Sequence, residues 1–562
     1  MTRLIECVPN FSEGRNPAVI QRITEAIAAV DGVALLHVDP GKSTNRTVVT
    51  FAGEPEPVVE AAFRAIKLAA ELIDMRQHQG EHPRMGATDV CPLVPISGVT
   101  LEEAARYATE LARRVGEELA IPVYLYEAAQ PNPARKNLAS IRAGEYEGFF
   151  KKIADPAWAP DFGPRIFNAQ AGATVIGARD FLVAYNINLN TTSTRRANAI
   201  AFDVREVGRP RREGHALTGK VATDAAGNPE MIPGTLKAVK AIGWYIDEYG
   251  VAQVSMNLTD LGTTSIHAAF DEVCRAAEAR GVRVTGSELI GLIPLRALLD
   301  AGRHYLRKQH RSLGVADAEL IHIAVKSLGL DELGPFKAEE RVIEYRLRDP
   351  SVRRLVDRSV TGFVNETASE SVAPGGGSVA ALVGALGAAL GTMVANLSSH
   401  KRGWDDRWEG FSDWAVKGQA IKDELLRLVD EDTAAFNGVM AALGMPKVTP
   451  EEKAARAEAL ESANRTALEV PYHVMRTAAS ALPLLRAMAD EGNPASASDA
   501  GVGALCVRTA VLGAWLNVRT NLAGLKQPER VAGLIADGDL IVAAATSAEA
   551  DILAIVEQKF QH

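Results

Sequence analysis

Apolar residues recur with two different periods along the first half of this chain. Short runs rich in Val, Ile and Leu, typical of strands, alternate with longer segments in which apolar residues recur every three to four positions, typical of helices. The predicted elements are a strand at 4–8, a helix at 17–30, strands at 33–38 and 46–51, a helix at 57–75 and a strand at 90–96. This βαββαβ order is that of the split βαβ or ferredoxin-like unit.

The same order of periods returns after residue 180. The predicted elements are a strand at 181–189, a helix at 195–207, strands at 241–246 and 252–258, a helix at 265–279 and an extended segment at 282–287. Residues 209–233, rich in Gly, Arg and Pro, look like an insertion without a core, and we infer no function for them. Two α/β lobes of this kind leave a cleft between them, where small molecules commonly bind.

Cap signals mark where several predicted helices begin. Asn16 precedes Pro17, and two capping boxes follow, Thr100 with Glu103 and Thr449 with Glu452. Between the two lobes the periodicity is lost, and Trp158 and Phe162 lie among prolines and glycines. We expect a fixed loop without regular structure there. Its aromatic side chains suit a flat ligand, and a linker is the alternative.

Beyond residue 336 the pattern becomes helical throughout. A charge-dense run at 337–354 predicts a linker, and every long segment after it has helical spacing, which predicts an all-α helical bundle. The chain is therefore expected to be multidomain, with two α/β ferredoxin-like (βαββαβ) subdomains followed by an all-α bundle. The predicted boundaries are 1–178, 179–336, 337–354 for the linker and 355–562.

Residues 371–399 contain no charged side chain and open with Gly375, Gly376 and Gly377. The length would allow a membrane span, but the segment is made of Ala and Gly rather than Leu and Ile, so we expect a helix buried on all sides of the bundle. Free amides at its N-terminus could bind an anion such as the carboxylate of a ligand. A tight turn before a close-packed helix is the alternative.

Composition narrows the class of protein. The chain has 562 residues, 47% hydrophobic and 23% charged, which is typical of an ordinary soluble protein of three or four compact units. A net charge of −9 argues against a nucleic-acid binder. Charged residues interrupt the first 30 positions, so we expect no signal peptide, and the four scattered cysteines fit a reducing compartment. The cytoplasm is the predicted location.

The densest group of reactive residues lies on the connection 76–89. His78 and His82 fit the inverted zinc-protease pattern H-x-x-E-H, which requires one helix. Gly80 weakens a helix there, and Pro83 moves His82 away from helical dihedrals. We therefore expect no metal site and favour a histidine that acts as a general base. A zinc hydrolase built on both histidines, and ordinary loop histidines, are the alternatives.

The turn around Asp39 carries a Gly-Lys-Ser sequence that resembles part of a P-loop. A P-loop requires a glycine five residues before Gly41, and Leu36 stands there instead. Nucleotide binding is therefore not expected. Asp39 is predicted either to enter the cleft beside His82 or to bond the backbone of its own turn.

Three separated motifs resemble the formiminotransferase-cyclodeaminase family, in the family's order. The first runs from Cys7 to Gly14 as CVPNFSEG and the second from His82 to Ala87 as HPRMGA, and both resemble glutamate formiminotransferases. The third runs from Ala373 to Ala380 as APGGGSVA and resembles the start of formiminotetrahydrofolate cyclodeaminases. The resemblance covers nearly the whole chain.

The resemblance implies site residues in the first half. His82 would be catalytic, taking a proton and returning it. Arg84 is our hypothesis for holding a substrate carboxylate, with a surface salt bridge as the alternative. The family's folate-contacting loop would be Gly163, Pro164, Arg165, Ile166, Phe167, Asn168, Ala169, Gln170, Ala171 and Gly172.

Asp432 is the candidate catalytic acid of the second half. It falls on an apolar helical stripe formed by Leu425, Leu428, Val429, Phe436, Val439 and Met440. A carboxylate on such a stripe is costly unless it is bonded, and burial should raise its pKa. The family's proposed catalytic aspartate matches the same residue, and a satisfied structural aspartate is the alternative. Asn517 and Asn521 share one helix face and either face a folate pocket or are exposed.

The resemblance implies a bifunctional folate enzyme of histidine degradation. It would transfer the formimino group from N-formimino-L-glutamate to tetrahydrofolate, its co-substrate, and then form 5,10-methenyltetrahydrofolate and ammonia without a metal. Its partners would be these small molecules, with no nucleic acid and no membrane, in a homo-oligomer that could be a ring of dimers. The alternatives are a methenyltetrahydrofolate cyclohydrolase or formyltransferase variant, and a non-catalytic folate-binding scaffold.

Overall fold

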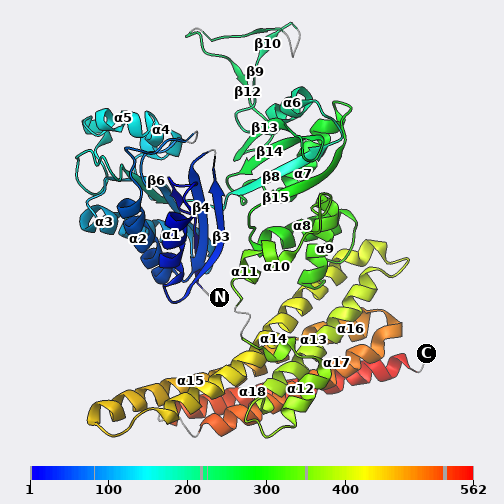
Figure 1. Cartoon of the computed structure of the whole chain (residues 1–562). Helices are drawn as coiled ribbons and strands as arrows, with labels where there is room; N and C mark the ends of the chain where they lie inside the picture. Colours follow the sequence, from blue (N-terminus) through cyan, green and yellow to red (C-terminus); the bar gives the residue numbers. More distant parts are fainter. Residues whose placement is uncertain are drawn as a thin grey trace. The chain divides into compact units, whose positions relative to one another are not determined.

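The computed structural model describes residues 3–42, 44–80, 83–214, 219–224, 226–348, 352–522 and 528–560. They divide into two compact units (Figure 1). Unit 1 comprises residues 1–301 and 324–348, and unit 2 comprises residues 302–323 and 349–562. Unit 1 contains the strands, and in unit 2 the described residues form helices and no strand. The predicted order of an α/β region followed by a helix-rich region is confirmed.

A seven-stranded sheet forms the first lobe of unit 1. Strand β3 pairs with β4, which is followed across the sheet by β1 and β2 together, then by β5, β7 and β6. The strands β5, β7 and β6 are parallel, and the other pairs are antiparallel. The bounds are β1 Leu4–Cys7, β2 Asn10–Phe11, α1 Pro17–Ala28, β3 Val33–Gly41, β4 Arg46–Gly53, α2 Pro55–Leu72, β5 Thr88–Ser97, α3 Leu101–Glu118, β6 Val123–Glu127 and β7 Thr174–Ala178.

Helices α1, α2 and α3 begin where local signals place them. The Asn16 side chain caps α1 ahead of Pro17, and Thr100 and Glu103 form a complete capping box on α3. The three helices share one apolar core with the sheet, which includes Ile5 and Cys7 of β1 and Cys91 and Leu93 of β5. Because successive strand residues face opposite sides, the residues between them lie on the other face of the sheet, which carries a candidate site.

The connection from β6 to β7 is more regular than its sequence predicts. We expected a loop without regular structure, but it contains η1 Pro133–Arg135, α4 Leu138–Arg142, α5 Glu145–Lys152 and η2 Pro156–Trp158. Ile141, Phe149 and Ile153 of this connection are buried against Tyr124 and Val175 of the sheet. Such short helices have too few turns to produce a readable period, which explains the miss.

The second lobe of unit 1 has a four-stranded antiparallel sheet in the order β13, β14, β8, β15. Its elements are β8 Val183–Leu189, α6 Thr194–Val204, β13 Val239–Ile246, β14 Val251–Leu258, α7 Ile266–Glu278 and β15 Val284–Ile290. The predicted insertion forms two short ribbons, β9 Arg209–Pro210 with β12 Met231–Ile232 and β10 Arg212–Glu213 with β11 Lys220–Val221. Helices α10 Ala338–Arg341 and α11 Ile343–Arg346 follow in unit 1, whereas α8 Leu295–Lys308 and α9 Asp317–Leu328 are each divided between unit 1 and unit 2. In α11, Ile343 is fully buried.

Unit 2 is a bundle of long helices (Figure 1). Its elements are η3 Leu355–Asp357, α12 Val360–Thr367, α13 Gly376–Ser399, η4 Asp405–Arg407, α14 Trp408–Gly444, α15 Pro450–Ala479, α16 Leu482–Glu491, η5 Pro494–Ser496, α17 Ala497–Leu522 and α18 Pro528–Lys559. The Thr449 and Glu452 capping box starts α15, as predicted.

The close packing of helix α13 explains why it contains only uncharged, mostly small residues. A side chain at Gly387 would meet the Gly503 carbonyl of α17, and one at Gly391 would meet Leu485 of α16, so the neighbouring helices pack against its backbone. The prediction that α13 is buried on all sides is wrong, because Leu386, Met393 and Leu397 are exposed on one face of the helix, where no helix among the described residues packs closely enough to cover them. The most apolar window of α13 is 61% buried inside the bundle, and that of the segment 494–522 is 50% buried. Both are long and apolar enough to span a membrane, which core helices of soluble bundles also are.

Candidate active sites

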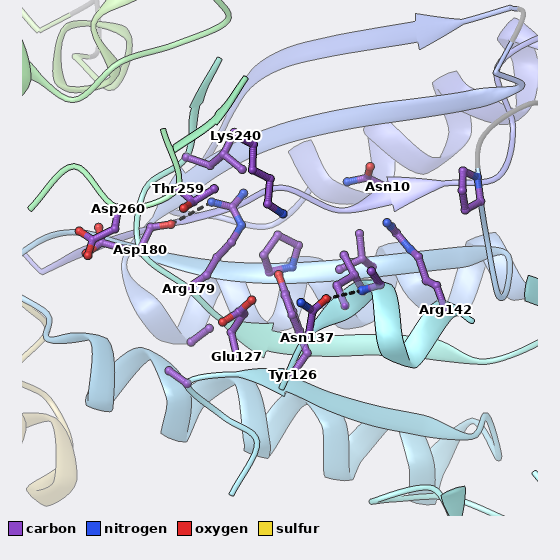
Figure 2. A pocket seen from close by; sticks show the side chains of 18 of the residues that line it. Asn10, Tyr126, Glu127, Asn137, Arg142, Arg179, Asp180, Lys240, Thr259 and Asp260 are labelled. Atoms are coloured by element: carbon purple, nitrogen blue, oxygen red, sulfur yellow. Dashed lines mark hydrogen bonds between the residues drawn. The ribbon is translucent and has the colours of Figure 1, made fainter. Parts of the chain in front are cut away.

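A cavity of about 850 Å³ lies in unit 1, on the face of the first sheet opposite α1, α2 and α3. We call it the unit 1 cavity. Its walls come from strands β2, β4, β5 and β6, from α4 and the residues before α5, and from the second lobe at Lys240, Thr259 and Asp260 (Figure 2). Three arginines line it together with Lys240, namely Arg46, Arg142 and Arg179.

Two of these arginines meet at one end of the cavity. Arg142 pairs with Asp89, which is fully buried and also accepts a hydrogen bond from the Met85 backbone N–H at 2.9 Å. Burial and the nearby Arg142 guanidinium lower the pKa of Arg46. Arg46 and Arg142 both lie near the buried Asp89, and guanidinium groups of this kind suit a carboxylate ligand.

The other arginine lies near the second lobe. The Arg179 Nη1 donates a hydrogen bond to the Asp180 carbonyl at 2.9 Å, and Figure 2 shows it on the side of the cavity where Lys240 and Thr259 also lie, away from Arg142 and Asn10. Asp180 and Asp260 offset this positive charge. The unit 1 cavity therefore has cationic groups at both ends and an apolar floor that includes Val90 and Pro92.

His82 lies outside the described residues. Pro83, the residue that follows it, lines the unit 1 cavity. Asp39 lies on β3 beside Val48 of β4 and is exposed, and its charge acts on Arg46. The predicted roles of His82 and Asp39 stay predictions.

Arg84 lies at the centre of a hydrogen-bonded network. Its guanidinium is only 7% exposed, and it donates to Glu147 at 2.7 Å and to Glu145 at 3.1 Å. Its Nε also donates to His78 Nδ1 at 3.1 Å, and His78 Nε2 lies 2.8 Å from the Asn45 carbonyl. His78 Nδ1 must then be an acceptor, which fixes the neutral tautomer, and burial lowers the pKa of His78. A substrate carboxylate would have to compete with Glu145 and Glu147 for Arg84.

The loop predicted to contact folate holds both ends of the segment that contains His82. The Gln170 carbonyl accepts from the Met75 N–H at 2.9 Å, and the Ala171 carbonyl accepts from the Ala87 N–H at 2.8 Å. Gly172, at φ +69°, packs directly on Met85. None of residues 163–172 lines the unit 1 cavity. Their contact with folate stays a prediction from the resemblance.

The other loop residues are engaged locally. Arg165 donates to the Ile153 carbonyl at 3.0 Å, and the Phe167 ring packs on Tyr146 and Phe149. Ile166 is 71% exposed, which is unusual for an isoleucine in an ordered loop. The loop is therefore fixed through Arg165 and Phe167 and presents Ile166 outward.

Sequence reasoning missed a buried acid in the first sheet, whose charge interacts with Arg179 of the unit 1 cavity. Glu6 of β1 is 4% exposed, and burial raises its pKa to about 7 while the charge of Arg179 opposes the shift. Folding raises the pKa of Glu6, so the folded protein holds this proton more tightly than the unfolded chain does. The contribution of Glu6 to the free energy of unfolding is therefore fully present below its unfolded pKa and is lost as the pH rises through about 7. Wild-type stability should therefore decline as the pH rises from 4.5 to about 7.

Replacing Glu6 with glutamine should remove that decline. We expect Glu6→Gln to raise the free energy of unfolding by up to about 3 kcal/mol at pH 8 and to change it little at pH 4. Urea unfolding at several pH values measures this. The exposed Glu102→Gln is the control and should follow the wild-type pH dependence. Equal stability of Glu6→Gln and wild type at pH 8 would contradict the prediction.

A second cavity, of about 420 Å³, lies in unit 2, and we call it the unit 2 cavity. Its walls come from the start of α13 and from helices α14, α15 and α17. They include the Asp432 carboxylate, the Phe436 ring and three asparagines, Asn464, Asn517 and Asn521. Asp432 is thus placed in a cavity by four helices from separate parts of the sequence.

Asp432 is bonded to the start of α13. The Ser378 hydroxyl donates to Asp432 Oδ2 at 3.0 Å, and the Ser378 backbone N–H bonds the same carboxylate. A Cβ on Gly377 would lie 2.1 Å from Asp432 Oδ1, so only glycine leaves room for the acid. We expected these amides to receive a folate carboxylate, and the protein's own carboxylate occupies that position.

Burial raises the pKa of Asp432, and the two bonds from Ser378 oppose the shift. The apolar stripe that identified Asp432 is buried on one side of this residue and lines the cavity on the other. Leu425, Leu428 and Val429, which precede Asp432, are buried in the core, whereas Phe436 is 38% exposed and lines the unit 2 cavity. Asp432 therefore lies where the helix face passes from the core to the cavity, a suitable position for a proton donor.

Ser378 is a positioning residue that acts through Asp432. Removing its hydroxyl should raise the pKa of Asp432 further, because a bond to the charged form is lost. For Ser378→Ala we expect the limb of the pH–rate profile of the unit 2 reaction that Asp432 controls to move to higher pH, and Ser378→Thr should restore it. The unit 1 reaction, measured on the same protein, should keep its profile. An unchanged unit 2 profile would contradict this role.

Several residues of the unit 1 cavity could not be identified as site residues from the sequence. Arg46 and Arg142 come from β4 and α4, and isolated arginines of this kind are usually surface residues. Asp89 follows the conspicuous loop and could have been noticed, because it immediately precedes a buried apolar strand. Among the residues that the structure describes, no group of three or more His, Cys, Asp and Glu side chains is arranged to hold a metal ion.

Comparison with known proteins places both cavities within matched regions. Residues 4–179 match the model "Formiminotransferase domain, N-terminal subdomain", residues 184–348 match "Formiminotransferase domain", and residues 359–537 match "Formiminotransferase-cyclodeaminase". The formimidoyltransferase-cyclodeaminase of Sus scrofa is 46% identical over 93% of this chain and 93% of its own length.

Two relatives match one part of the chain each. The glutamate formimidoyltransferase of Streptococcus pyogenes is 41% identical over 55% of this chain and 94% of its own length. The methenyltetrahydrofolate cyclohydrolase of Methylorubrum extorquens is 37% identical over 30% of this chain and 81% of its own length. The first of these relatives shows that a formimidoyltransferase can exist without a helical second half.

Proposed function

Since the chain belongs to the formiminotransferase-cyclodeaminase family, we propose that its chemistry is divided between the two cavities. It is a bifunctional folate enzyme of histidine degradation, a transferase and an ammonia lyase. It transfers the formimino group from N-formimino-L-glutamate to tetrahydrofolate, and it then converts 5-formiminotetrahydrofolate to 5,10-methenyltetrahydrofolate and ammonia. Tetrahydrofolate is its co-substrate.

The unit 1 cavity is proposed as the site of the transfer. N5 of tetrahydrofolate attacks the formimino carbon, a bond to N5 forms, and the bond from that carbon to the glutamate nitrogen breaks. His82 takes the proton from N5 and returns it to the departing amine. The end formed by Arg46 and Arg142 is the proposed place for a carboxylate of formiminoglutamate.

The unit 2 cavity is proposed as the site of cyclodeamination. N10 attacks the formimino carbon that N5 carries, a bond to N10 forms, and the bond from that carbon to the terminal nitrogen breaks. Asp432 takes the N10 proton and delivers it to the departing nitrogen, so that ammonia leaves rather than an amide anion. Burial of Asp432 supports this role, because a raised pKa suits exchange of a proton near neutral pH.

The observation that carries the proposal is that each unit has its own cavity with different chemistry. Arginines line the unit 1 cavity, and a half-buried acid lies in the unit 2 cavity. The test supplies formiminoglutamate and tetrahydrofolate to the full chain and follows glutamate, ammonia and methenyltetrahydrofolate separately. All three products are expected in equal amounts. Binding of tetrahydrofolate without any product would identify a folate-binding scaffold instead.

A cyclohydrolase activity of unit 2 is the second candidate. The matching relative from Methylorubrum extorquens carries that name, and its similarity is limited to about a third of this chain. Both reactions break or form a bond to the same one-carbon unit of the folate. Supplying 5,10-methenyltetrahydrofolate alone and following its hydrolysis distinguishes this activity from ammonia release.

We also propose the fold of each lobe, the domain boundaries, the cellular location and the oligomeric state. The strand orders β3, β4, β1, β5 and β13, β14, β8, β15 support ferredoxin-like lobes at 1–178 and 179–336, with a linker at 337–354 before the cyclodeaminase domain at 355–562. Cytoplasmic location and a homo-oligomer, such as a ring of dimers, complete the proposal. Gel filtration with light scattering tests the oligomer.

A further inference from the structure

Three asparagine side chains line the unit 2 cavity together with Asp432. Asn464 comes from α15, and Asn517 and Asn521 lie four residues apart on α17, so they share one face of that helix. All three are half-buried. The position that a Cβ of Gly376 would take is 3.3 Å from Asn517 Nδ2, which places this amide beside the start of α13, where Asp432 is bonded.

The amide groups of Asn517 and Asn521 each have a fixed orientation. Asn517 Nδ2 donates to the Gly513 carbonyl at 2.8 Å, one turn earlier on the same helix. Asn521 Nδ2 donates to the Ala467 carbonyl of α15 at 2.6 Å. A backbone carbonyl accepts hydrogen bonds and cannot donate them, so in both amides the NH₂ group must face the protein. In each amide the oxygen is bonded to the same carbon as the NH₂ group and points to the other side.

The two amide oxygens are therefore available to a ligand as acceptors. Within the described residues of the bundle, 352–522 and 528–560, neither Asn517 Oδ1 nor Asn521 Oδ1 accepts a hydrogen bond. Both side chains line the cavity, and apolar walls from Phe436 and Val439 complete it. An apolar slot with a few fixed polar groups is the usual form of a site for a flat heterocycle.

A pair of acceptors is complementary to one edge of the pterin ring. The 2-amino group and N3–H of a 2-amino-4-oxopterin are neighbouring donors that point to the same side of the ring. We propose that Asn517 Oδ1 and Asn521 Oδ1 accept hydrogen bonds from these two donors and so determine that the unit 2 cavity takes a 2-amino-4-oxopterin. This inference rests on the proposed function of unit 2 and assigns its specificity residues.

The same bonds also allow a purely structural role. The bond from Asn521 to Ala467 connects α17 with α15, and its loss could loosen the bundle without any effect on recognition. A structural role would change the stability or the rate with every substrate alike. A recognition role would change the discrimination between substrates that differ in one donor. The experiment must therefore compare two ligands in each variant.

The experiment supplies 5-formiminotetrahydrofolate, or its 2-desamino analogue, directly to the full chain and measures kcat/KM for ammonia release. We expect the wild type to prefer the natural substrate by about 10- to 100-fold. One of the two asparagines accepts the hydrogen bond from the 2-amino group. When that residue is replaced, in Asn517→Ala or in Asn521→Ala, the ratio of kcat/KM for the natural substrate to that for the analogue should fall to about threefold or less. The exposed Asn365→Ala on α12 is the control and should keep the full preference.

Preservation of the wild-type preference in both variants would overturn the inference. Should Asn521→Ala unfold too readily to assay, Asn517→Ala carries the test with the 2-desamino and the 3-methyl analogues in turn, because its bond stays within α17. Absence of ammonia release by the wild type is a different result, which rejects the proposed function of unit 2 and the inference with it.

Discussion

Asp432→Asn should lower ammonia release from 5-formiminotetrahydrofolate by about 10³-fold while glutamate release from formiminoglutamate continues at the wild-type rate. Proton transfer by a positioned side chain contributes about 10²- to 10⁴-fold in enzymes. An amide has the size of the acid and can still accept the Ser378 bond, but it cannot carry the proton. The reaction should therefore stop at 5-formiminotetrahydrofolate, which separate assays of glutamate and ammonia will show.

The control for this variant is Glu431→Gln on the same turn of α14. Glu431 is partly exposed and pairs with Arg427, so its replacement should change neither product. Asp432→Ala should stop the reaction at the same intermediate. If Asp432→Asn released ammonia at more than about a tenth of the wild-type rate, another group would have to be the acid.

His82→Ala should abolish release of glutamate, and ammonia should still be released when 5-formiminotetrahydrofolate is supplied directly. The residue matches the family motif, and Pro83 next to it lines the unit 1 cavity. Loss of a general base that also serves as the acid should lower the transfer rate by about 10²- to 10⁴-fold. A stopped assay of free glutamate measures it.

Added imidazole distinguishes loss of the proton carrier from loss of the fold. In His82→Ala, millimolar imidazole should restore part of the glutamate release, because a small base can enter the space that the side chain left. The exposed His37→Ala on β3 of the same lobe is the control and should behave as the wild type. Normal glutamate release by His82→Ala without imidazole would exclude the assigned role.

Local signals were sufficient for most helices and strands. The caps at Asn16, Thr100 and Thr449 lie where the sequence predicts them, because a cap depends on residues within one turn. The short helices α4 and α5 were missed, because their burial depends on Tyr124 and Val175 of the sheet rather than on any local period. Prediction from sequence failed where stability came from distant contacts.

The same distinction between local signals and distant contacts applies to the site residues. Asp432 was identified twice, by the family motif and by an acid on an apolar stripe, and it lies in a cavity. Its partner Ser378 could not be identified, because the two meet only when α13 packs on α14. Arg84 was expected to bind substrate on the basis of its residue type, and its contacts with Glu145 and Glu147 depend on α5, which the sequence did not reveal.

By itself, the sequence determined the α/β half and the helical half, the presence of the uncharged helix α13 within the bundle, the family and one acid. These depend on side-chain period, caps and motifs, which are local properties. The tertiary structure alone decided which groups come together. Arg46 interacts with Arg142 and Glu6 with Arg179 through their charges, Asp432 is hydrogen-bonded to Ser378, and Asp432 shares a cavity with the asparagines of α17. The reason is physical, because these contacts join segments far apart in the chain and form only when the cores on which they rest are packed.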